Sequence, residues 1–352
     1  HSEYFQTLSR MLHREKLARP TMLVDLDRVD HNIAELKKHL GDKAYRIVAK
    51  SIPVPGLIDY VMKQSQSDRL MVFHQPFLNL IAREMPDAQL LVGKPMPAEA
   101  ARRFYQYHQQ PAFTPATQLE WLIDSPLRLR QYRELANALG QPMKLNLELD
   151  VGLHRGGYTD PAVLAQSIRD IQQDPLLQFS GLMGYEAHAS KMPSIVGGPE
   201  QALQDAMAFY GRCVDAVRET LGEQFDPAQL TLNAGGSSTF QMYDQSAPCN
   251  ELAMGSGLVK PTDFDVQYLS NHLPAAFIAT PVLKALDRTQ LPGLEGLTGL
   301  FRALDPNTAH TFFTYGGYWK AIPESPPGLS YNALLGSSTN QEMLNGSRAV
   351  SL

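Results

Sequence analysis

A strand, a glycine-rich loop and a helix follow one another in residues 144–171, which read KLNLELDVGLHRGGYTDPAVLAQSIRDI. Residues 144–149 carry a leucine at every second position, which is typical of a strand. Asp160-Pro161 is typical of a helix start, because an acidic N-cap precedes a proline in the first turn. The apolar residues of this helix recur at spacings of four and three: Leu164, Ile168 and Ile171. The stretch therefore predicts one β–α unit with a polar loop between its two elements.

The same alternation of short apolar runs and amphipathic stretches continues on both sides. It predicts eight strands: Tyr45–Ala49, Arg69–Phe73, Gln89–Val92, Glu120–Asp124, Lys144–Leu149, Ser180–Glu186, Leu230–Asn233 and Glu251–Met254. Most are separated by a segment long enough for a helix, and such alternation implies a parallel sheet. Eight units predict an α/β fold, a closed (β/α)₈ TIM-like barrel, over residues 20–265.

The pattern changes near residue 265, where prolines become frequent and helical periodicity is lost. We expect a mostly β domain over 266–352, with strands at 311–318 and 331–335. It has no obvious closing element, which suggests an incomplete domain. Residues 1–19 are expected to form an N-terminal helical extension. A first strand at 21–26 could pair with either domain.

The composition argues against several classes of function. The 352 residues carry a formal charge of −5 and no basic block, which argues against nucleic acid as the main partner. No apolar run approaches the roughly 20 residues that a membrane span needs. Cys213 and Cys249 are the only cysteines, which excludes a disulfide framework and argues against a structural zinc site of cysteines. A reducing, cytoplasmic location is the default expectation.

Lys50 directly follows the expected strand at 45–49. In a (β/α)₈ barrel, the carboxyl ends of the strands line the active site. A lysine that is partly desolvated there beside other cations can have a lowered pKa and serve as a Schiff-base amine. The alternative is an ordinary surface lysine after a strand.

Arg155 lies in the glycine-rich loop after the strand at 144–149. Its guanidinium could donate a forked pair of hydrogen bonds to a phenolic or carboxylate oxygen. The alternative is a loop closed by a salt bridge between Arg155 and Asp150. Tyr185 and His188 would reach the barrel mouth if their strand ends near Glu186, although a lone histidine is more often structural.

Glycines followed by hydroxyl residues occur after the expected seventh and eighth strands. The first loop is Asn233-Ala234-Gly235-Gly236-Ser237-Ser238-Thr239, and the second is Gly255-Ser256-Gly257. Such loops form phosphate cradles from backbone N–H groups, and barrels commonly bind phosphate after strands seven and eight. A plain glycine turn remains the alternative for either loop alone.

In their order along the chain, these motifs resemble the fold-type III, alanine-racemase-like pyridoxal phosphate enzymes. The resemblance covers residues 20 to about 345 and opens with three motifs: Pro20-Thr21 through Asp25-Leu26-Asp27, Asn32-Ile33 and Ala49-Lys50-Ser51. Three further motifs resemble the D-threonine aldolase and D-serine dehydratase branch: Glu148-x-Asp150-x-Gly152-x-x-Arg155-x-Gly157, Gly235-Gly236-Ser237-Ser238 and Glu251-x-x-x-Gly255-Ser256.

The resemblance implies a role for each matched residue. Lys50 would hold the cofactor covalently and act as the base at Cα, Arg155 would contact the phenolic oxygen of the cofactor ring, and Tyr185 and His188 would line the ring or the substrate. The remaining cofactor-binding candidates are Asn233, Gly235, Gly236, Ser237, Ser238, Gly255 and Ser256. Such enzymes are typically homodimers in which the β domain of one subunit closes the active site of the other.

The chain departs from the family pattern in three places. Residues 252–254 read Leu-Ala-Met, where the racemases carry an arginine beside the ring nitrogen. A ring nitrogen without that arginine is protonated more readily, which favours a stabilised carbanion and hence aldol cleavage or elimination. Met343 stands where the aldolase branch has a histidine, and the metal ligands of that branch are not seen in this chain. A divalent metal remains an open possibility.

Three functions follow as hypotheses. The first is a pyridoxal phosphate enzyme that cleaves or dehydrates small D-3-hydroxy amino acids. The second is an amino acid racemase, because Gly316-Gly317-Tyr318-Trp319 faintly resembles the racemase segment with a second catalytic base, Tyr318. The alternative for Tyr318 is an aromatic residue in the core of the β domain. The third is a non-catalytic cofactor-binding or homeostasis protein, against which the extra β domain argues.

Overall fold

The computed structural model describes residues 2–261, 264–287, 293–297, 299–300, 303, 311–315, 330–331 and 341–345. The chain divides into two compact units, one from Leu26 to Leu273 and the other made of His1–Asp25 with Pro274–Leu352. The first unit therefore begins and ends slightly later than the barrel limits of 20 and 265 expected from the sequence.

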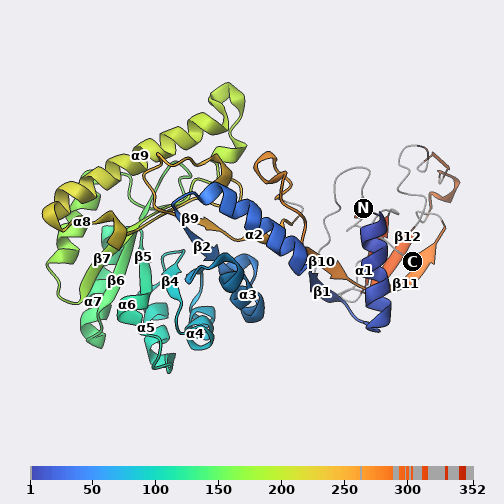
Figure 1. Cartoon of the computed structure of the whole chain (residues 1–352), viewed down its shortest axis with the longest axis horizontal. Helices are drawn as coiled ribbons and strands as arrows, with labels where there is room; N and C mark the ends of the chain where they lie inside the picture. Colours follow the sequence, from blue (N-terminus) through green and yellow to red (C-terminus); the bar gives the residue numbers. More distant parts are fainter. Residues whose placement is uncertain are drawn as a thin grey trace. The chain divides into compact units, whose positions relative to one another are not determined.

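The larger unit contains a closed barrel of eight parallel strands (Figure 1). Its strands are β2 (Ala44–Val48), β3 (Arg69–Val72), β4 (Gln89–Val92), β5 (Leu119–Ile123), β6 (Met143–Leu149), β7 (Leu177–Gly184), β8 (Thr231–Ala234) and β9 (Glu251–Met254). Strand β9 pairs in parallel with β2 and closes the ring. The prediction of an eight-stranded barrel is confirmed, and every expected strand overlaps an observed one.

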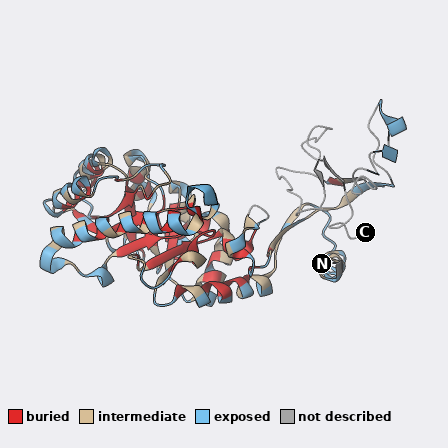
Figure 2. Ribbon diagram, turned by 90° about the horizontal axis from the view of Figure 1, so that it is seen from above, coloured by how far each residue is buried: buried red, intermediate tan, exposed pale blue. Residues whose placement is uncertain are grey.

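Helices surround this barrel (Figure 1). They are α2 (Leu26–Leu40), α3 (Pro55–Ser65), α4 (Gln75–Glu84), α5 (Ala98–Tyr107), α6 (Pro115–Gln118), α7 (Pro126–Leu139), α8 (Pro161–Gln172), α9 (Gly198–Leu221) and α10 (Ser256–Val259). The start of α8 follows the sequence signal, because the Asp160 carboxylate accepts a hydrogen bond from the Ala162 N–H and proline opens the helix. Figure 2 shows buried residues concentrated on the barrel strands and exposed residues on the outer faces of the helices.

Charged side chains fill part of the barrel interior. Arg46 on β2 and Glu251 on β9 are almost fully buried and form an ion pair in which Arg46 Nη2 lies 3.0 Å from Glu251 Oε2. Arg69 Nη1 donates a second charged hydrogen bond to Glu251 at 2.7 Å. Charges this deep are stable only when they are paired and hydrogen bonded. The network therefore holds β2, β3 and β9 in register.

An apolar cluster also lies in the barrel and consists of Met71, Leu91, Leu122, Met183 and Ala253. These residues come from five different strands, and three partly buried side chains pack against them: Val48, Phe73 and Tyr185. Phe73 and Tyr185 follow the carboxyl ends of β3 and β7. The cluster thus forms an apolar floor under the side chains at the barrel mouth.

The second unit is made of the two ends of the chain. It contains α1 (Ser2–Arg14), β1 (Thr21–Val24), β10 (Ala276–Ala279), β11 (Val282–Leu286), β12 (Thr311–Tyr315), β13 (Ser330–Tyr331) and β14 (Gln341–Asn345). Strand β1 pairs with β10 in antiparallel fashion, so the first strand belongs to this unit. The other four form a sheet in the order β11-β12-β14-β13. The expected strands at 311–318 and 331–335 extend beyond the described residues.

None of the helices in the described ranges is long and apolar enough to cross a membrane. Both cysteines, Cys213 and Cys249, are buried free thiols.

Buried His272 makes the stability of the larger unit depend on pH. Burial lowers the pKa of this imidazole to about 4, whereas an unfolded histidine titrates near its ordinary value of about 6.5. The unfolded chain therefore binds a proton first as the pH falls. We expect the free energy of unfolding to decrease between pH 6.5 and 4, by up to about 3 kcal/mol from this group.

Urea unfolding of the protein and of His272→Leu at a series of pH values tests this expectation. Each protein serves as its own reference at pH 8, where the imidazole is neutral in both states. The variant should lose less stability on acidification than the parent. Equal losses in the two proteins would show that His272 does not cause the acid sensitivity.

Candidate active site at the barrel mouth

Lys50 lies where the sequence analysis expected it, directly after β2, in the short 3₁₀ helix Ala49–Ser51. Its Nζ stands 4.6 Å from the centre of the Phe73 ring, which follows β3. Partial desolvation and the positive charges of Lys94 and Arg155 lower the pKa of the Lys50 amine. A larger share of neutral amine at a given pH makes this lysine a better nucleophile than an ordinary surface lysine.

Arg155 is held in place by Glu148 and Tyr185. The Arg155 Nη2 donates a hydrogen bond to Glu148 Oε1 at 3.2 Å, and the guanidinium carbon lies 4.8 Å from the centre of the Tyr185 ring. Burial raises the pKa of the Glu148 carboxyl even though Arg155 opposes this shift. The salt bridge that the sequence suggested for this loop is present, but it joins Arg155 to Glu148, whereas Asp150 accepts hydrogen bonds from the Gly152 and His154 N–H groups.

Tyr185 follows β7 and lies between the apolar floor and the first glycine loop. A Cβ atom on Gly236 would lie 2.8 Å from Cε2 of this ring, so only glycine allows the loop to pack against it. Burial, followed by the nearby Glu186 charge, raises the pKa of the Tyr185 hydroxyl. The group therefore stays protonated at neutral pH and can donate a hydrogen bond.

The two glycine loops are joined to each other and to the Lys50 segment. The Ser237 hydroxyl of the first loop accepts a hydrogen bond from the Gly257 N–H of the second loop at 2.9 Å. The hydroxyls of Ser51 and Ser256 lie 2.8 Å apart and share a hydrogen bond. The segments after β2, β8 and β9 thus form one continuous wall of the barrel mouth.

The shape of this wall depends on glycines, which allow the main chains of neighbouring segments to approach closely. Gly235 has a φ of +83°, which favours glycine, and a Cβ atom on Gly255 would collide with the carbonyl oxygen of Val48. Ser237 and Ser238 are almost fully buried. Their backbone N–H groups have no hydrogen-bond partner among the residues that the structure describes. Buried N–H groups of this kind can bind an anion.

Glu186 supports the first loop and was not singled out from the sequence. Its carboxylate is fully buried, and it accepts hydrogen bonds from the Gly235 N–H at 3.3 Å and from the Thr239 hydroxyl at 2.5 Å. Burial raises the pKa of this carboxyl. The available signal was an acidic residue at the end of the expected strand at 180–186, but one such residue does not identify a functional role by itself.

Two candidates from the sequence lie elsewhere in the barrel unit, and a third is not among the described residues. The Asn233 side chain points into the barrel network, where its Nδ2 donates to Glu251 Oε1 at 2.8 Å. His188 lines a separate hollow together with His154 and Phe209, and desolvation lowers the pKa of its imidazole. Tyr318 lies outside the described residues.

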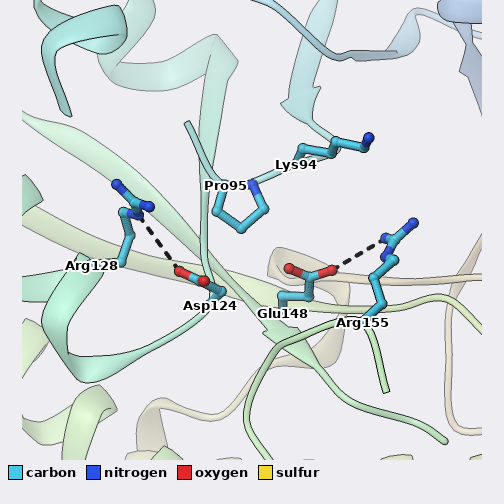
Figure 3. A pocket seen from close by; sticks show the side chains of 6 residues that line it. All are labelled: Lys94, Pro95, Asp124, Arg128, Glu148 and Arg155. Atoms are coloured by element: carbon cyan, nitrogen blue, oxygen red, sulfur yellow. Dashed lines mark hydrogen bonds and ion pairs between the residues drawn. The ribbon is translucent and has the colours of Figure 1, made fainter. Parts of the chain in front are cut away.

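A pocket of about 300 Å³ opens beside Arg155, at the carboxyl ends of β4, β5 and β6 (Figure 3). Its lining residues are Lys94, Pro95, Asp124, Arg128, Glu148 and Arg155. Of these, only Glu148 and Arg155 belong to a motif that the sequence pointed to. Figure 3 shows Arg128 and Arg155 on opposite sides, with the carboxylates of Asp124 and Glu148 between them. No cluster of three or more metal-ligating side chains occurs within the described part of the chain.

Solved structures with the same fold include a D-threonine aldolase from Filomicrobium marinum, which is 16% identical over 94% of this chain and 85% of its own, with a TM-score of 0.67. D-threo-3-hydroxyaspartate dehydratase from Delftia sp. HT23 is 14% identical over 94% and 84% of the two chains, with a TM-score of 0.64. Histidine racemase from Leuconostoc mesenteroides subsp. sake NBRC 102480 is 13% identical over 95% and 86%, also with a TM-score of 0.64. Identities this low show the fold alone.

The chain matches no curated protein sequence. The family model of the alanine racemase N-terminal domain, in contrast, matches residues 24–263, which span the whole barrel. Members of this family bind pyridoxal phosphate. The barrel, the lysine after its first strand and the glycine loops after its last two agree with that match, and the chain belongs to the alanine racemase N-terminal domain family.

Proposed function

We propose that the protein is a pyridoxal phosphate-dependent lyase that acts on small D-amino acids, and in particular on D-3-hydroxy amino acids. One observation carries the assignment to a cofactor enzyme: the segment of Lys50 is hydrogen bonded to the second glycine loop through Ser51 and Ser256. A lysine with a lowered pKa and an anion-binding wall are therefore parts of one site. The cytoplasmic location and the homodimer expected from the sequence stay predictions.

The residues present fit a phosphate-bearing group. Ser237 and Ser238 offer buried N–H groups that have no partner in the residues that the structure describes, and their hydroxyls add donors. The glycines of both loops let the backbone pack closely, because a Cβ atom on Gly236 or Gly255 would collide with the Tyr185 ring or with the Val48 carbonyl oxygen. In this proposal Gly235, Gly236, Ser237, Ser238, Gly255 and Ser256 hold the phosphate. Asn233 acts as a positioning residue, because it fixes Glu251 at the base of the first loop.

Other side chains would attach the cofactor, contact its ring and transfer the proton. Pyridoxal phosphate supplies the electron sink for charge that develops at Cα of an amino acid. Lys50 holds the cofactor, and its amine, with its lowered pKa, moves the proton at the reacting carbon. Arg155, oriented by Glu148, would donate to the phenolic oxygen, and Tyr185, which already packs against the Arg155 guanidinium, would line the cofactor ring. His188 is left with the less specific role of lining the neighbouring hollow.

The residues of β9 support a lyase. Leu252, Ala253 and Met254 are buried and apolar, so this strand offers no cation to a ring nitrogen. Without such a cation the nitrogen is free to be protonated, which strengthens the electron sink and favours bond cleavage beyond simple proton return. A racemase remains the alternative that the racemase-like motif around Tyr318 suggests, and a non-catalytic cofactor carrier is the third possibility.

Product analysis with D-threonine separates these functions. Retro-aldol cleavage gives glycine and acetaldehyde, and elimination gives 2-oxobutanoate and ammonia. We expect one of these product pairs from D-threonine and neither from L-threonine. Epimerised threonine without either pair would contradict the lyase and support the racemase. A protein that binds the cofactor, is inert to every amino acid and passes the cofactor to an apoenzyme would support the carrier.

A further inference from the structure

The pocket beside Arg155 contains more cations than its own carboxylates neutralise. Arg128 Nε lies 3.6 Å from Asp124 Oδ1, and Arg155 Nη2 lies 3.2 Å from Glu148 Oε1. The Lys94 amine has no hydrogen bond or ion pair in the part of the chain that the structure describes. Three cations thus face two carboxylates, and the excess positive charge resides on Lys94.

Arg128 also has unused hydrogen-bonding capacity. Its Nε is buried and lacks a hydrogen-bond partner within the described ranges, while its Nη1 donates to Gln131 at 3.0 Å. A buried donor without a partner is costly, and a ligand that accepts its hydrogen bond recovers that cost. Lys94 and Arg128 therefore both favour an anionic or strongly accepting group in this pocket.

The pocket adjoins the proposed reacting centre at Lys50. The charge of Lys94 is close enough to lower the pKa of the Lys50 amine, and Arg155 belongs both to the pocket and to the proposed ring contact. Pro95 limits the freedom of the chain next to Lys94 and keeps the pocket wall stiff. A substrate held at Lys50 could reach the pocket with its side chain.

We propose that Lys94, assisted by Arg128, binds a carboxylate on the side chain of the substrate, so that the preferred substrates are acidic D-amino acids with the carboxylate one or two carbons from Cα. This inference rests on the proposed function and specifies its substrate class. The carboxylates of Asp124 and Glu148 are already paired with arginines and leave Lys94 as the free partner. A neutral side chain of the same size would leave the excess charge without a partner.

Binding of D-aspartate, D-asparagine and D-alanine to the holoenzyme tests the proposal. The first two differ in charge but hardly in shape, and all three lack the 3-hydroxyl that a lyase requires. Dissociation constants come from the change in the visible absorption of the bound cofactor. We expect D-aspartate to bind about fivefold more tightly than D-asparagine, as a partly exposed ion pair allows. The preference should weaken at high ionic strength.

Lys94→Met should reduce the preference for D-aspartate over D-asparagine to below about twofold, while D-alanine, measured in parallel, reports any effect of the lost charge on Lys50 itself. Lys144→Met is the matched control, because Lys144 lies at the opposite end of the barrel, where its Nζ donates to the Thr117 carbonyl. The control should keep the full preference for D-aspartate.

Two results would overturn the proposal while leaving the proposed function intact. One is a parent holoenzyme that responds to all three amino acids without preference for D-aspartate. The other is an equal loss of affinity for all three amino acids in Lys94→Met, which would show that Lys94 binds the carboxylate on Cα. A protein that takes up no cofactor would contradict the proposed function and this inference together.

Discussion

Replacement of Lys50 by alanine should reduce kcat/KM with D-threonine by at least about a thousandfold. The variant would lose both the covalent attachment point and the amine that moves the proton at Cα, and no second lysine follows β2 within the described residues. Steady-state kinetics with purified protein measures the effect. Because Lys50 is exposed and, among the described residues, its Nζ makes only a cation–π contact with Phe73, the fold should be retained.

Lys63→Ala provides the matched control, since Lys63 is exposed on α3 and pairs with Asp59 one turn away. Its kcat/KM should stay within about twofold of the parent value, as expected for an exposed ion pair. If Lys50→Ala kept a tenth or more of the parent activity, the lysine would not perform the chemistry assigned to it.

Replacement of Glu251 by alanine should lower the free energy of unfolding by about 3–5 kcal/mol. Arg46 is only 1% exposed, so its charge would remain in the barrel without its main partner. Urea unfolding followed by circular dichroism measures the loss. Glu99→Ala, which removes an exposed partner of Arg102 on α5, should cost less than about 1 kcal/mol.

A double variant separates charge burial from loss of volume. In Arg46→Met with Glu251→Leu, both charges disappear, and we expect much of the lost stability to return, because buried ion pairs can often be replaced by apolar residues at little cost. An unfolding free energy as low as that of Glu251→Ala would show instead that the hydrogen bonds to Arg69 and Asn233 are the important part of the network.

The barrel was predictable because its signals are local. Each strand is a short apolar run and each helix has periodic apolar positions, and the start of α8 at Asp160-Pro161 coincides with the sequence signal. Lys50 and the two glycine loops could be found for the same reason: strand ends in a barrel share one face, so residues far apart in the sequence could be placed together.

Other parts of the molecule depend on contacts that no local pattern encodes. The first strand could have joined either domain, and its pairing of Thr21 with Ala279 spans most of the chain. Three single charged residues near strand ends belong to the site: Glu186, Lys94 and Arg128. Their place in it could be recognised only once their burial and their partners were known. Asn233 belongs to a motif of the first loop, yet the alternation of side chains along β8 turns it toward Glu251.

Reductive trapping shows whether this chain holds pyridoxal phosphate through Lys50. The protein is incubated with pyridoxal phosphate and reduced with borohydride, and the labelled peptide is identified by mass spectrometry. We predict one phosphopyridoxyl group per chain on the Lys50 side chain, and none in Lys50→Ala. Labelling at another lysine, or no labelling above that of Lys50→Ala, would contradict the account.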